Sequence, residues 1–274
     1  DRKSVNGARD SRAEVISTDE IAADFYVTRL RSAHMATARP GQFVNVRVRD
    51  GIDPFLRIPL SVAAVDVEGG TFDVMYEDMG PKSHFLRSVT PGMVLSCIGP
   101  LGNSFPAPLE GQCLVLVAGG IGLPPVLYHG RELVSAGCVD VRLLVGARSA
   151  AKLVAEERFR DAATATSIAT DDGSAGYRGF VTNLLAEELE SLTLPPVVCS
   201  CGPHGMLAAV ASICAEQSIP CYVSLEEYMA CGIGICVGCV VERRSHRVNK
   251  QSPYHQYSRI CVDGPVYDAT EIDW

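Results

Sequence analysis

Four cysteines near the C-terminus constrain this chain more than any other feature of its sequence. Cys231, Cys236 and Cys239 share one glycine-rich loop, and Cys261 follows at a distance. Four residues separate the first two cysteines and two separate the next pair, which is the spacing of plant-type [2Fe–2S] sites. Four thiolates suit this cluster because each iron takes two cysteine sulfurs besides the bridging sulfides. The spacing therefore predicts a [2Fe–2S] cluster held by these residues.

Two other interpretations of these cysteines compete with the cluster. A structural zinc site also uses four thiolates, but it normally pairs two short knuckles, whereas here three cysteines share one loop. Gly232, Gly234 and Gly238 would let that loop wrap a cluster closely and aim backbone N–H groups at its sulfurs. The remaining cysteines lie mostly in apolar runs, where unligated thiols act as small hydrophobic residues. They are Cys97, Cys113, Cys138, Cys199, Cys201, Cys214 and Cys221.

Composition argues against several classes of protein. The 274-residue chain has a net charge of −8 and a pI near 5.3, so it lacks the basic stripe of a nucleic-acid binder. Its N-terminal stretch holds no apolar core of signal-peptide length, which predicts a cytoplasmic location where thiols stay reduced and can ligate metals. The longest nearly apolar run, Cys113 to Leu127, is too short and too rich in glycine and proline for a membrane span.

The pattern of apolar residues changes along the chain and divides it into two parts. From about residue 13 to 104, short runs alternate apolar and polar positions between turn signals such as Pro91-Gly92, which is typical of an antiparallel sheet or barrel. From residue 112, continuous apolar strands alternate with helical segments, which predicts a parallel α/β sheet. We therefore expect an α+β multidomain chain with an antiparallel β-barrel at 1–108, an α/β domain at 109–223 and a cysteine-rich module at 224–274.

Two glycine-containing turns lie between a strand and a helix in the α/β part. Their residues are Gly119, Gly120 and Gly122 in the first turn and Cys201, Gly202 and Pro203 in the second. Such turns let the backbone approach a pyrophosphate, which the positive end of the next helix attracts. The first turn departs from the G-x-G-x-x-G pattern and could equally be a plain tight turn, and no acidic residue closes the strand at 145–148. Two such turns on one sheet nevertheless favour a dinucleotide crevice.

The barrel part offers contacts for a flavin. Arg57 and Ser61 supply a cation and a hydroxyl on either side of Pro59, which suits a phosphate and a ring edge, although the pattern is common on sheet edges. Tyr76 could stack on the flavin ring or belong to the core. Ser83 could cap a helix whose N–H groups face a diphosphate, or simply cap that helix.

Taken in this order, these segments resemble the ferredoxin–NADP reductase superfamily and, within it, the electron-transfer subunits of type B dihydroorotate dehydrogenases. The most specific stretches are 99–103, 170–174 with 179–182, 201–203, 224–227 with the Cys231 loop, and 261–266. The resemblance covers nearly the whole chain. It implies an N-terminal FAD-binding barrel, a Rossmann-like NAD-binding α/β domain and a C-terminal [2Fe–2S] module.

The resemblance also implies which residues touch the cofactors. FAD would contact Arg57, Ile58, Pro59, Leu60, Ser61, Val74, Met75, Tyr76, Lys82 and Ser83. The nicotinamide coenzyme would lie over Gly119 to Gly122 and Cys201 to Pro203, with Cys201 either near the hydride-transfer position or merely structural. Many members carry Arg in place of Ile58 and Gly-Thr in place of Lys82-Ser83. Arg-Ile-Pro-Leu-Ser is instead similar to the small subunit of NADH-dependent ferredoxin:NADP oxidoreductase, in which aspartate is expected to replace one cluster cysteine.

The three cofactors imply electron transfer. A nicotinamide gives two electrons as hydride, a [2Fe–2S] cluster accepts one at a time, and FAD can mediate between them. No group of residues here would activate an organic substrate, so the resemblance implies one subunit of a hetero-oligomeric oxidoreductase whose flavin-containing partner oxidises dihydroorotate in pyrimidine biosynthesis. The alternatives are a reductase for ferredoxin or sulfur species, and a zinc-stabilised binding module without redox function. The choice between NAD and NADP stays open, although Arg148 and Ser149 could meet a 2′-phosphate.

Overall fold

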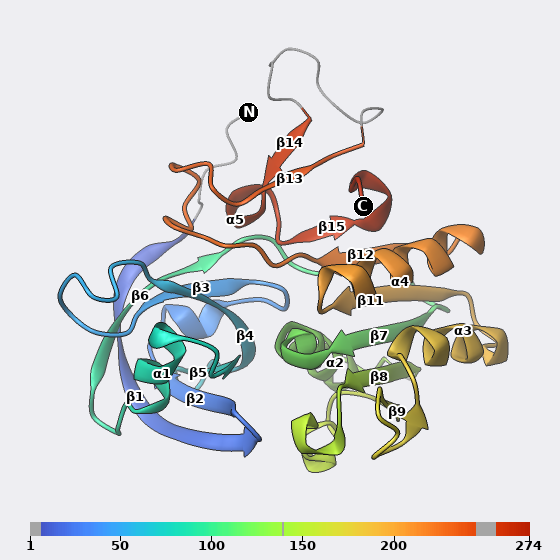
Figure 1. Cartoon of the computed structure of the whole chain (residues 1–274), viewed down its shortest axis with the longest axis horizontal. Helices are drawn as coiled ribbons and strands as arrows, with labels where there is room; N and C mark the ends of the chain where they lie inside the picture. Colours follow the sequence, from blue (N-terminus) through green and yellow to red (C-terminus); the bar gives the residue numbers. More distant parts are fainter. Residues whose placement is uncertain (1–6, 139, 245–255) are drawn as a thin grey trace.

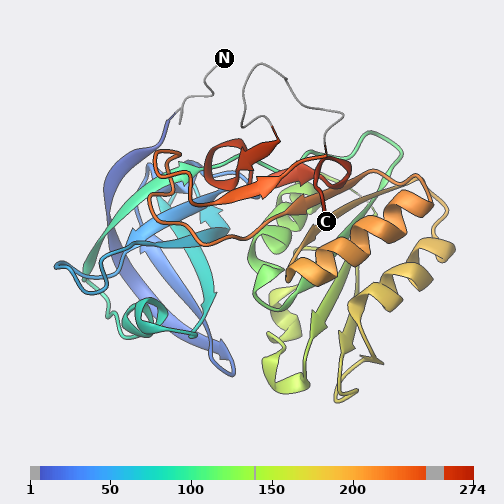
Figure 2. The ribbon, with the colours of Figure 1, turned by 45° about the horizontal axis from the view of Figure 1, so that its top comes forward.

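The computed structural model describes residues 7–138, 140–244 and 256–274. A β-barrel and a parallel sheet with helices lie side by side, and the C-terminal segment runs across the edge where they meet (Figure 1). Turning the molecule brings that segment forward over both bodies (Figure 2). This arrangement confirms the expected fold class, a β-barrel joined to an α/β domain, which the two patterns of apolar residues predicted.

The barrel is closed and antiparallel, with the strand order β1-β2-β5-β4-β3-β6. Its elements are β1 (Arg9–Ala22), β2 (Phe25–Arg31), the 3-10 helix η1 (Met35–Thr37), β3 (Phe43–Arg47), β4 (Ile58–Asp66), β5 (Thr71–Glu77), α1 (Pro81–Arg87) and β6 (Val94–Leu101). Successive side chains on a strand point to opposite faces. Val44 and Val46 of β3 therefore lie in the barrel core with Val74 of β5, whereas Phe43 packs outward against the neighbouring body.

The parallel sheet has seven strands in the order β10-β9-β8-β7-β11-β12-β15, and only β15 runs antiparallel to its neighbour. Its strands are β7 (Cys113–Gly119), β8 (Val141–Ala147), β9 (Ala165–Thr170), β10 (Tyr177–Arg178), β11 (Pro196–Cys201), β12 (Cys221–Ser224) and β15 (Val266–Asp268). The connecting helices are η2 (Gly120–Gly122), α2 (Leu123–Ser135), η3 (Ala150–Lys152), η4 (Glu156–Arg158), α3 (Val181–Ser191) and α4 (His204–Glu216).

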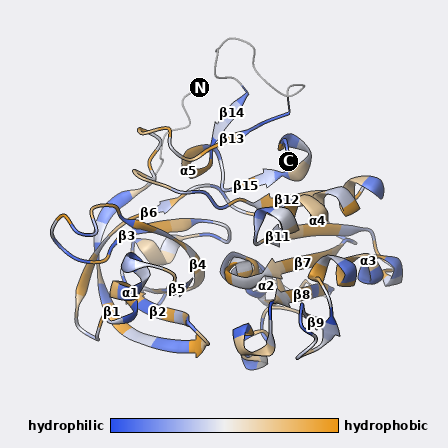
Figure 3. Cartoon of the chain, in the orientation of Figure 1, coloured by the Kyte–Doolittle hydropathy of each residue, from blue (hydrophilic) through white to orange (hydrophobic). Residues whose placement is uncertain are grey.

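The two faces of this sheet are covered by different helices. Leu114 and Leu116 of β7 pack with α2, whereas Val115 and Val117 pack with α3 and α4. All residues of β7 are buried, as expected of a strand covered on both sides, and β7 and β11 carry hydrophobic colours in Figure 3. In the described part of the chain, no helix is both long enough and apolar enough to cross a membrane.

The C-terminal segment returns to the parallel sheet. After β12 it contains β13 (Val240–Glu242), β14 (Tyr257–Arg259), α5 (Ile260–Asp263), β15 and η6 (Ala269–Glu271). Ile260, Cys261 and Tyr267 belong to the same apolar core as α3 and α4. The Asn103 amide, in the loop leaving the barrel, donates to Val266 O at 2.7 Å and accepts from Val266 N at 2.8 Å. The segment is thus packed against both bodies rather than standing apart.

Direct contacts also join the barrel to the α/β part. The Tyr128 hydroxyl on α2 donates to Ala38 O at 2.7 Å. Lys152 Nζ lies 2.9 Å from a carboxylate oxygen of Asp24 and 3.0 Å from one of Glu77. Apolar residues of α2 also share a core cluster with Ala63 of β4, so both polar and apolar contacts join the two bodies.

Candidate functional site

A cavity of about 500 Å³ lies where the barrel faces the carboxyl edge of the parallel sheet. Its volume is within the range of roughly 300–1,000 Å³ typical of small-molecule sites. Six residues predicted to contact a flavin line it: Ile58, Pro59, Leu60, Ser61, Met75 and Tyr76. The structure thus brings the two barrel strands β4 and β5 together around one hollow, as the flavin hypothesis requires.

Apart from Ile121, which lies within the turn predicted to bind the nicotinamide, sequence reasoning missed the opposite wall of this cavity. That wall comes from the turn after β7, the segment after β12 and the loop before β15, with Ile121, Pro124, Ser224, Leu225, Glu226, Glu227, Tyr228, Met229 and Pro265. A signal existed, because the stretch 224–227 belongs to the family resemblance, but no pattern assigned it to a site. Glu226 borders the cavity with an exposed side chain, and partial desolvation of its carboxylate by the surrounding protein raises its pKa.

Tyr76 and Val74 face the barrel interior. Val74 is fully buried, so only its main chain is available to a ligand. The Tyr76 hydroxyl bonds to Thr28 Oγ1 at 3.0 Å, its ring stacks on Tyr26 at 5.9 Å between centroids, and burial raises its pKa. Tyr76 is therefore a core aromatic residue whose surface also borders the cavity, while Met75 points out toward the sheet.

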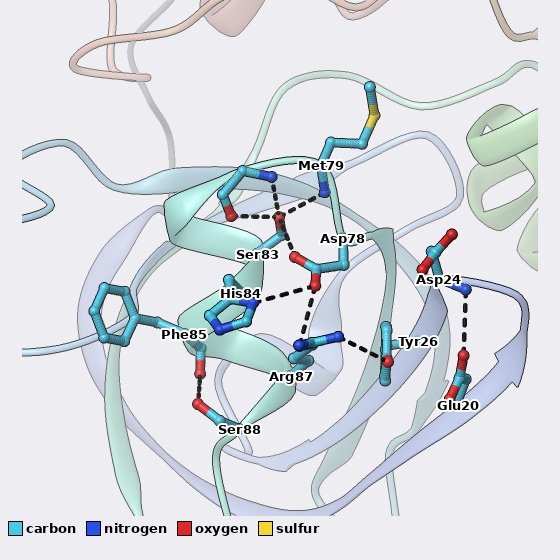
Figure 4. A network of polar contacts seen from close by, with 11 residues as sticks. Glu20, Asp24, Tyr26, Asp78, Met79, Ser83, His84, Phe85, Arg87 and Ser88 are labelled. Carbon is cyan, nitrogen blue, oxygen red and sulfur yellow. Dashed lines mark hydrogen bonds and ion pairs between the residues drawn. The ribbon is translucent and has the colours of Figure 1, made fainter.

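Three other predicted flavin contacts lie away from the cavity and bind protein groups. Arg57 donates to Ser96 O and Ser96 Oγ, both at 2.8 Å. Lys82 Nζ donates to Arg57 O at 3.1 Å, and burial lowers the pKa of Lys82. Ser83 Oγ accepts the backbone N–H groups of Met79 and Gly80, each at 3.0 Å (Figure 4). Ser83 thus caps α1, and contact of these three residues with a flavin stays a prediction.

The two glycine-containing turns lie next to each other. They follow β7 and β11, which are adjacent parallel strands, and the chain leaves β7 toward β8 on one side and reaches β11 and β12 on the other. This is a topological switch point, and ligands of open α/β sheets bind in the crevice outside the strand ends at such a point. The tertiary structure therefore strengthens a signal that was weak in sequence.

The glycines of these turns are required chiefly by packing. A Cβ on Gly122 would lie 2.2 Å from Cys201 O, and a Cβ on Gly119 would lie 2.5 Å from the sulfur of Met206. Gly120, with φ +53°, faces open space and could approach a ligand. Cys201 is completely buried and burial raises its pKa. It does not line the cavity, so a role near the hydride-transfer position stays a prediction.

The four cluster cysteines gather at the barrel end of the C-terminal segment and form two pairs. The Cys236 N–H donates to Cys231 Sγ at 3.4 Å, and the Ile260 N–H, next to Cys261, donates to Cys239 O at 2.8 Å. Cys239 and Cys261 are buried, whereas Cys236 is exposed. Among the described residues, no three His, Cys, Asp or Glu side chains surround a single point as a one-ion site. Two pairs of thiols match a two-iron cluster, in which each iron takes two cysteines.

The loop around Cys231 is built to hold a negative sulfur. Its Sγ accepts the backbone N–H groups of Ile233 and Cys236, both at 3.4 Å. Burial would raise the pKa of Cys231, but these hydrogen bonds outweigh it and lower the pKa to about 7. The interaction between Cys239 and Cys261 lowers the pKa of Cys239 and raises that of Cys261, so Cys239 ionises first. Thiolate is the form that ligates metal, so the donor set fits a [2Fe–2S] cluster.

Two of the three loop glycines have the expected conformational role. Gly232 and Gly234 have φ of +68° and +83°, which non-glycine residues rarely adopt. A Cβ on Gly234 would lie 2.4 Å from Val262. Gly238 does not have a positive φ; Val237 does, at +57°. The backbone at Gly238 therefore does not require glycine, and its close approach to the cluster stays a prediction.

Comparison with known proteins agrees with this geometry. The family model described as the iron–sulfur cluster binding domain of dihydroorotate dehydrogenase B matches residues 226–273, and that of the oxidoreductase NAD-binding domain matches residues 116–212. A solved structure of an NADH-dependent reduced ferredoxin-NADP oxidoreductase has a TM-score of 0.81 and 29% identity, covering 96% of this chain and 90% of that one. A ferredoxin reductase of carbazole 1,9a-dioxygenase, with a TM-score of 0.67 and 24% identity over 78% of this chain and 67% of that one, shares the fold.

Curated relatives carry the comparison further. A protein of Shouchella clausii called dihydroorotate dehydrogenase B (NAD(+)), electron transfer subunit is 37% identical over 269 residues, which cover 96% of this chain and 98% of the relative. A protein of the same name from Desulforamulus reducens is 32% identical, covering 96% of this chain and 97% of the relative. With such identity along nearly its whole length, the chain belongs to the family of dihydroorotate dehydrogenase B electron transfer subunits.

Proposed function

We propose that this chain carries electrons between a dihydroorotate-oxidising catalytic subunit and NAD(+), through FAD and a [2Fe–2S] cluster. One observation supports this most directly. The cavity lined by the predicted flavin contacts lies between the crevice of the two glycine-containing turns and the segment that leads into the cluster loop. A flavin bound in this cavity would lie between the nicotinamide coenzyme and the [2Fe–2S] cluster.

The protein's own residues bind and orient the cofactors. Bound FAD takes up electrons in pairs from a nicotinamide or singly from a cluster, which lets it connect the two. Ser61 and Pro59 would hold one side of the flavin ring, and Met75 would hold the side toward the sheet. Ile121 and Pro124 bring the first glycine-containing turn to the same cavity, so a nicotinamide over that turn would meet the flavin directly.

NAD(+) is the coenzyme that the names of the relatives give, and the charges at the sheet edge agree. Asp171 and Asp172 follow β9, and their backbone N–H groups bond to Ala147 O and Arg148 O at the end of β8. Hydrogen bonds from Ser174 lower the pKa of Asp172, which keeps this carboxylate ionised. The two carboxylates at this edge favour ribose hydroxyls and repel a 2′-phosphate, and they lie beside the cations of Arg148 and Arg178.

The catalytic partner would approach the cluster loop. Cys236 is exposed, and Ile235 and Val237 beside it are 77% and 54% exposed, so the loop offers an apolar surface close to the cluster ligands. Exposed apolar side chains of this kind commonly mark protein contacts. All the described cysteines are free thiols, which suits a reducing compartment, and we place the complex in the cytoplasm.

Purification without oxygen tests this function. The expected product is a coloured complex that contains flavin, iron and a second, flavin-bearing subunit, and that reduces NAD(+) when dihydroorotate is added. NADH should bleach the flavin of the isolated chain. A colourless, zinc-containing protein, or a complex that ignores dihydroorotate while carrying all three cofactors, would contradict the proposal.

Reduction of ferredoxin is the second candidate. The likeness to the NADH-dependent ferredoxin-NADP oxidoreductase structure favours it, as does the sequence Arg57 to Ser61. The same purified complex distinguishes the two: NADH-driven reduction of ferredoxin, together with no turnover of dihydroorotate, would select this alternative.

A further inference from the structure

One buried polar residue, Asn45 on β3, connects the candidate flavin site to the candidate cluster site. The strand reads Phe-Val-Asn-Val-Arg, and the Asn45 side chain is only 1% exposed. Burying an amide among apolar residues is unfavourable unless it is hydrogen-bonded. Neither the family resemblance nor the cavity accounts for an asparagine at this position.

Asn45 contacts groups on both sides of the gap between the two sites. Its Nδ2 donates to the main-chain carbonyl of Cys231 at 3.2 Å. Its own main-chain carbonyl accepts from the Arg57 guanidinium at 3.3 Å. In the sheet it pairs directly with Pro59, and cross-strand partners place their side chains on the same face, about 5 Å apart. A cavity-lining residue and a cluster ligand are therefore both immediate neighbours of Asn45.

The cluster loop is packed tightly against this side chain. A Cβ on Gly232 would lie 2.5 Å from Asn45 Nδ2, so only glycine lets the loop approach so closely. The hydrogen bond and this contact together hold the start of the loop against β3.

The other end of the Asn45 amide has no partner in the protein. Its Oδ1 is buried and accepts no hydrogen bond from any described residue. Proteins rarely leave a buried acceptor unpaired, because this costs about 1–3 kcal/mol. The unpaired oxygen is therefore available to a donor outside the described residues, such as a water molecule next to the cluster loop.

We propose that Asn45 is a positioning residue for electron transfer between flavin and cluster, holding the Cys231 end of the cluster loop at a set position relative to the flavin-binding strand. This inference rests on the proposed function. Groups outside the ligand shell that orient a ligand commonly change metal affinity or activity by about 10–100-fold when they are replaced. Electron transfer is especially sensitive to such positioning, because its rate falls steeply with distance.

The test replaces Asn45 with leucine, which has a similar size but no hydrogen bond. NADH should bleach the flavin of N45L at nearly the parent rate, and flavin-mediated reduction of ferricyanide should persist. Reduction of the cluster by the flavin should slow about tenfold in stopped-flow experiments, and the electron paramagnetic resonance spectrum of the reduced cluster should change. Iron and flavin contents confirm that N45L is loaded.

Asn103→Leu is the matched control. Asn103 also joins the barrel side to the C-terminal segment through its amide, but it contacts Val266 and Asp263 and no cluster cysteine. N103L should leave the flavin-to-cluster rate within about twofold of the parent. If N103L slows this step as much as N45L does, docking of the segment in general is responsible, and the inference about Asn45 is overturned.

A second variant covers the case in which N45L loses its cluster. In Asn45→His, a ring N–H at the δ position can still donate to Cys231 O, so cluster content and transfer rate should recover. Three results contradict the proposal. The first is a fully loaded N45L that transfers electrons from flavin to cluster at the parent rate, and the second is a fully loaded N45H that is as slow as N45L in this step. The third is loss of the cluster from both variants. Failure of the proposed function shows differently: the parent itself would carry reduced flavin that never reduces the cluster.

Discussion

The cluster loop and the dinucleotide crevice make an informative comparison, because both depend on glycines and cysteines but in different ways. In the cluster loop, the functional atoms are side-chain sulfurs within nine residues plus one more distant cysteine. In the crevice, backbone turns separated by about eighty residues in the chain meet at adjacent strands. Side-chain ligands can be recognised from sequence, whereas a backbone surface becomes recognisable only once the strands are placed.

Replacing a cluster ligand should have the largest effect. Cys239→Ser removes a buried thiolate whose pairing with Cys261 places two sulfurs together, so we expect loss of the cluster and of electron transfer from dihydroorotate to NAD(+). Flavin reduction by NADH should persist. Iron analysis and the visible spectrum measure this, with Cys138→Ser as the control. Retention of full iron and activity by C239S would show that Cys239 is not a ligand.

Replacing a crevice glycine should damage packing first and binding second. Gly122→Ala places a methyl group 2.2 Å from Cys201 O, so both turns must shift, and we expect a loss of about 3 kcal/mol of stability with a raised KM for NADH. Denaturant unfolding and NADH titration measure these effects.

Gly205→Ala is the control in the same region, because a Cβ there meets nothing within 4 Å. It should be neutral or slightly stabilising. If G122A and G205A have the same stability and the same KM for NADH, the close contact between the two turns is not required for folding or coenzyme binding. The comparison between loop and crevice would then lose its basis.

The crevice side should also show a pH dependence through α2. Burial lowers the pKa of His129 from 6.5 to about 4, and its Nε2 has no hydrogen-bond partner among the described residues. The unfolded chain therefore binds the proton more strongly, so stability is highest above pH 6.5 and falls as the pH drops toward 4. Between pH 7 and pH 5 we expect a loss of about 2 kcal/mol from this group.

The difference between the parent and His129→Gln isolates that contribution. Denaturant unfolding at each pH should give a steeper loss for the parent than for H129Q. The ring stacks on Phe105 in the loop leaving the barrel, at 5.2 Å between centroids, so the same titration should loosen this contact. Parallel pH profiles for the two proteins would show that His129 is not neutral in the fold.

The smallest expected effect is on coenzyme choice. Changing both Asp171 and Asp172 to asparagine removes the negative charges at the end of β9, so kcat/KM for NADPH relative to NADH should rise about tenfold, or about 1.4 kcal/mol. Changing Glu187 and Glu190 to glutamine removes the same charge from the exposed side of α3 and should leave the ratio unchanged. An equal shift in both double variants would indicate a general charge effect.

Much of the architecture was predictable from local patterns. Period-two alternation predicted the barrel, and continuous apolar runs such as residues 113–118 predicted the parallel strands, because each pattern reports which faces of a strand are buried. Patterns could not predict that Val266 to Asp268 would return to pair with β12, since a three-residue strand carries too little periodicity.

The candidate site divides in the same way. Ile58 to Ser61 were found because they form one continuous motif, and they do line the cavity. Arg57, Lys82 and Ser83 belong to the same motifs but bind protein groups here, which no motif could reveal. The wall formed by Ser224 to Met229 was not assigned to the site, although 224–227 belongs to the family resemblance, because its residues matter only by facing a distant strand.

By itself, the sequence determined which chemistry this protein can hold: the spacing of four cysteines selects a two-iron cluster, and the family motifs select the flavin and nicotinamide. Tertiary structure alone decided where those groups meet. It placed β4, the turn after β7 and the segment after β12 around one cavity, and it set Asn45 against Cys231, 186 residues further along the chain. Ligand type is a property of individual side chains, whereas distance between sites results from packing among segments far apart in sequence.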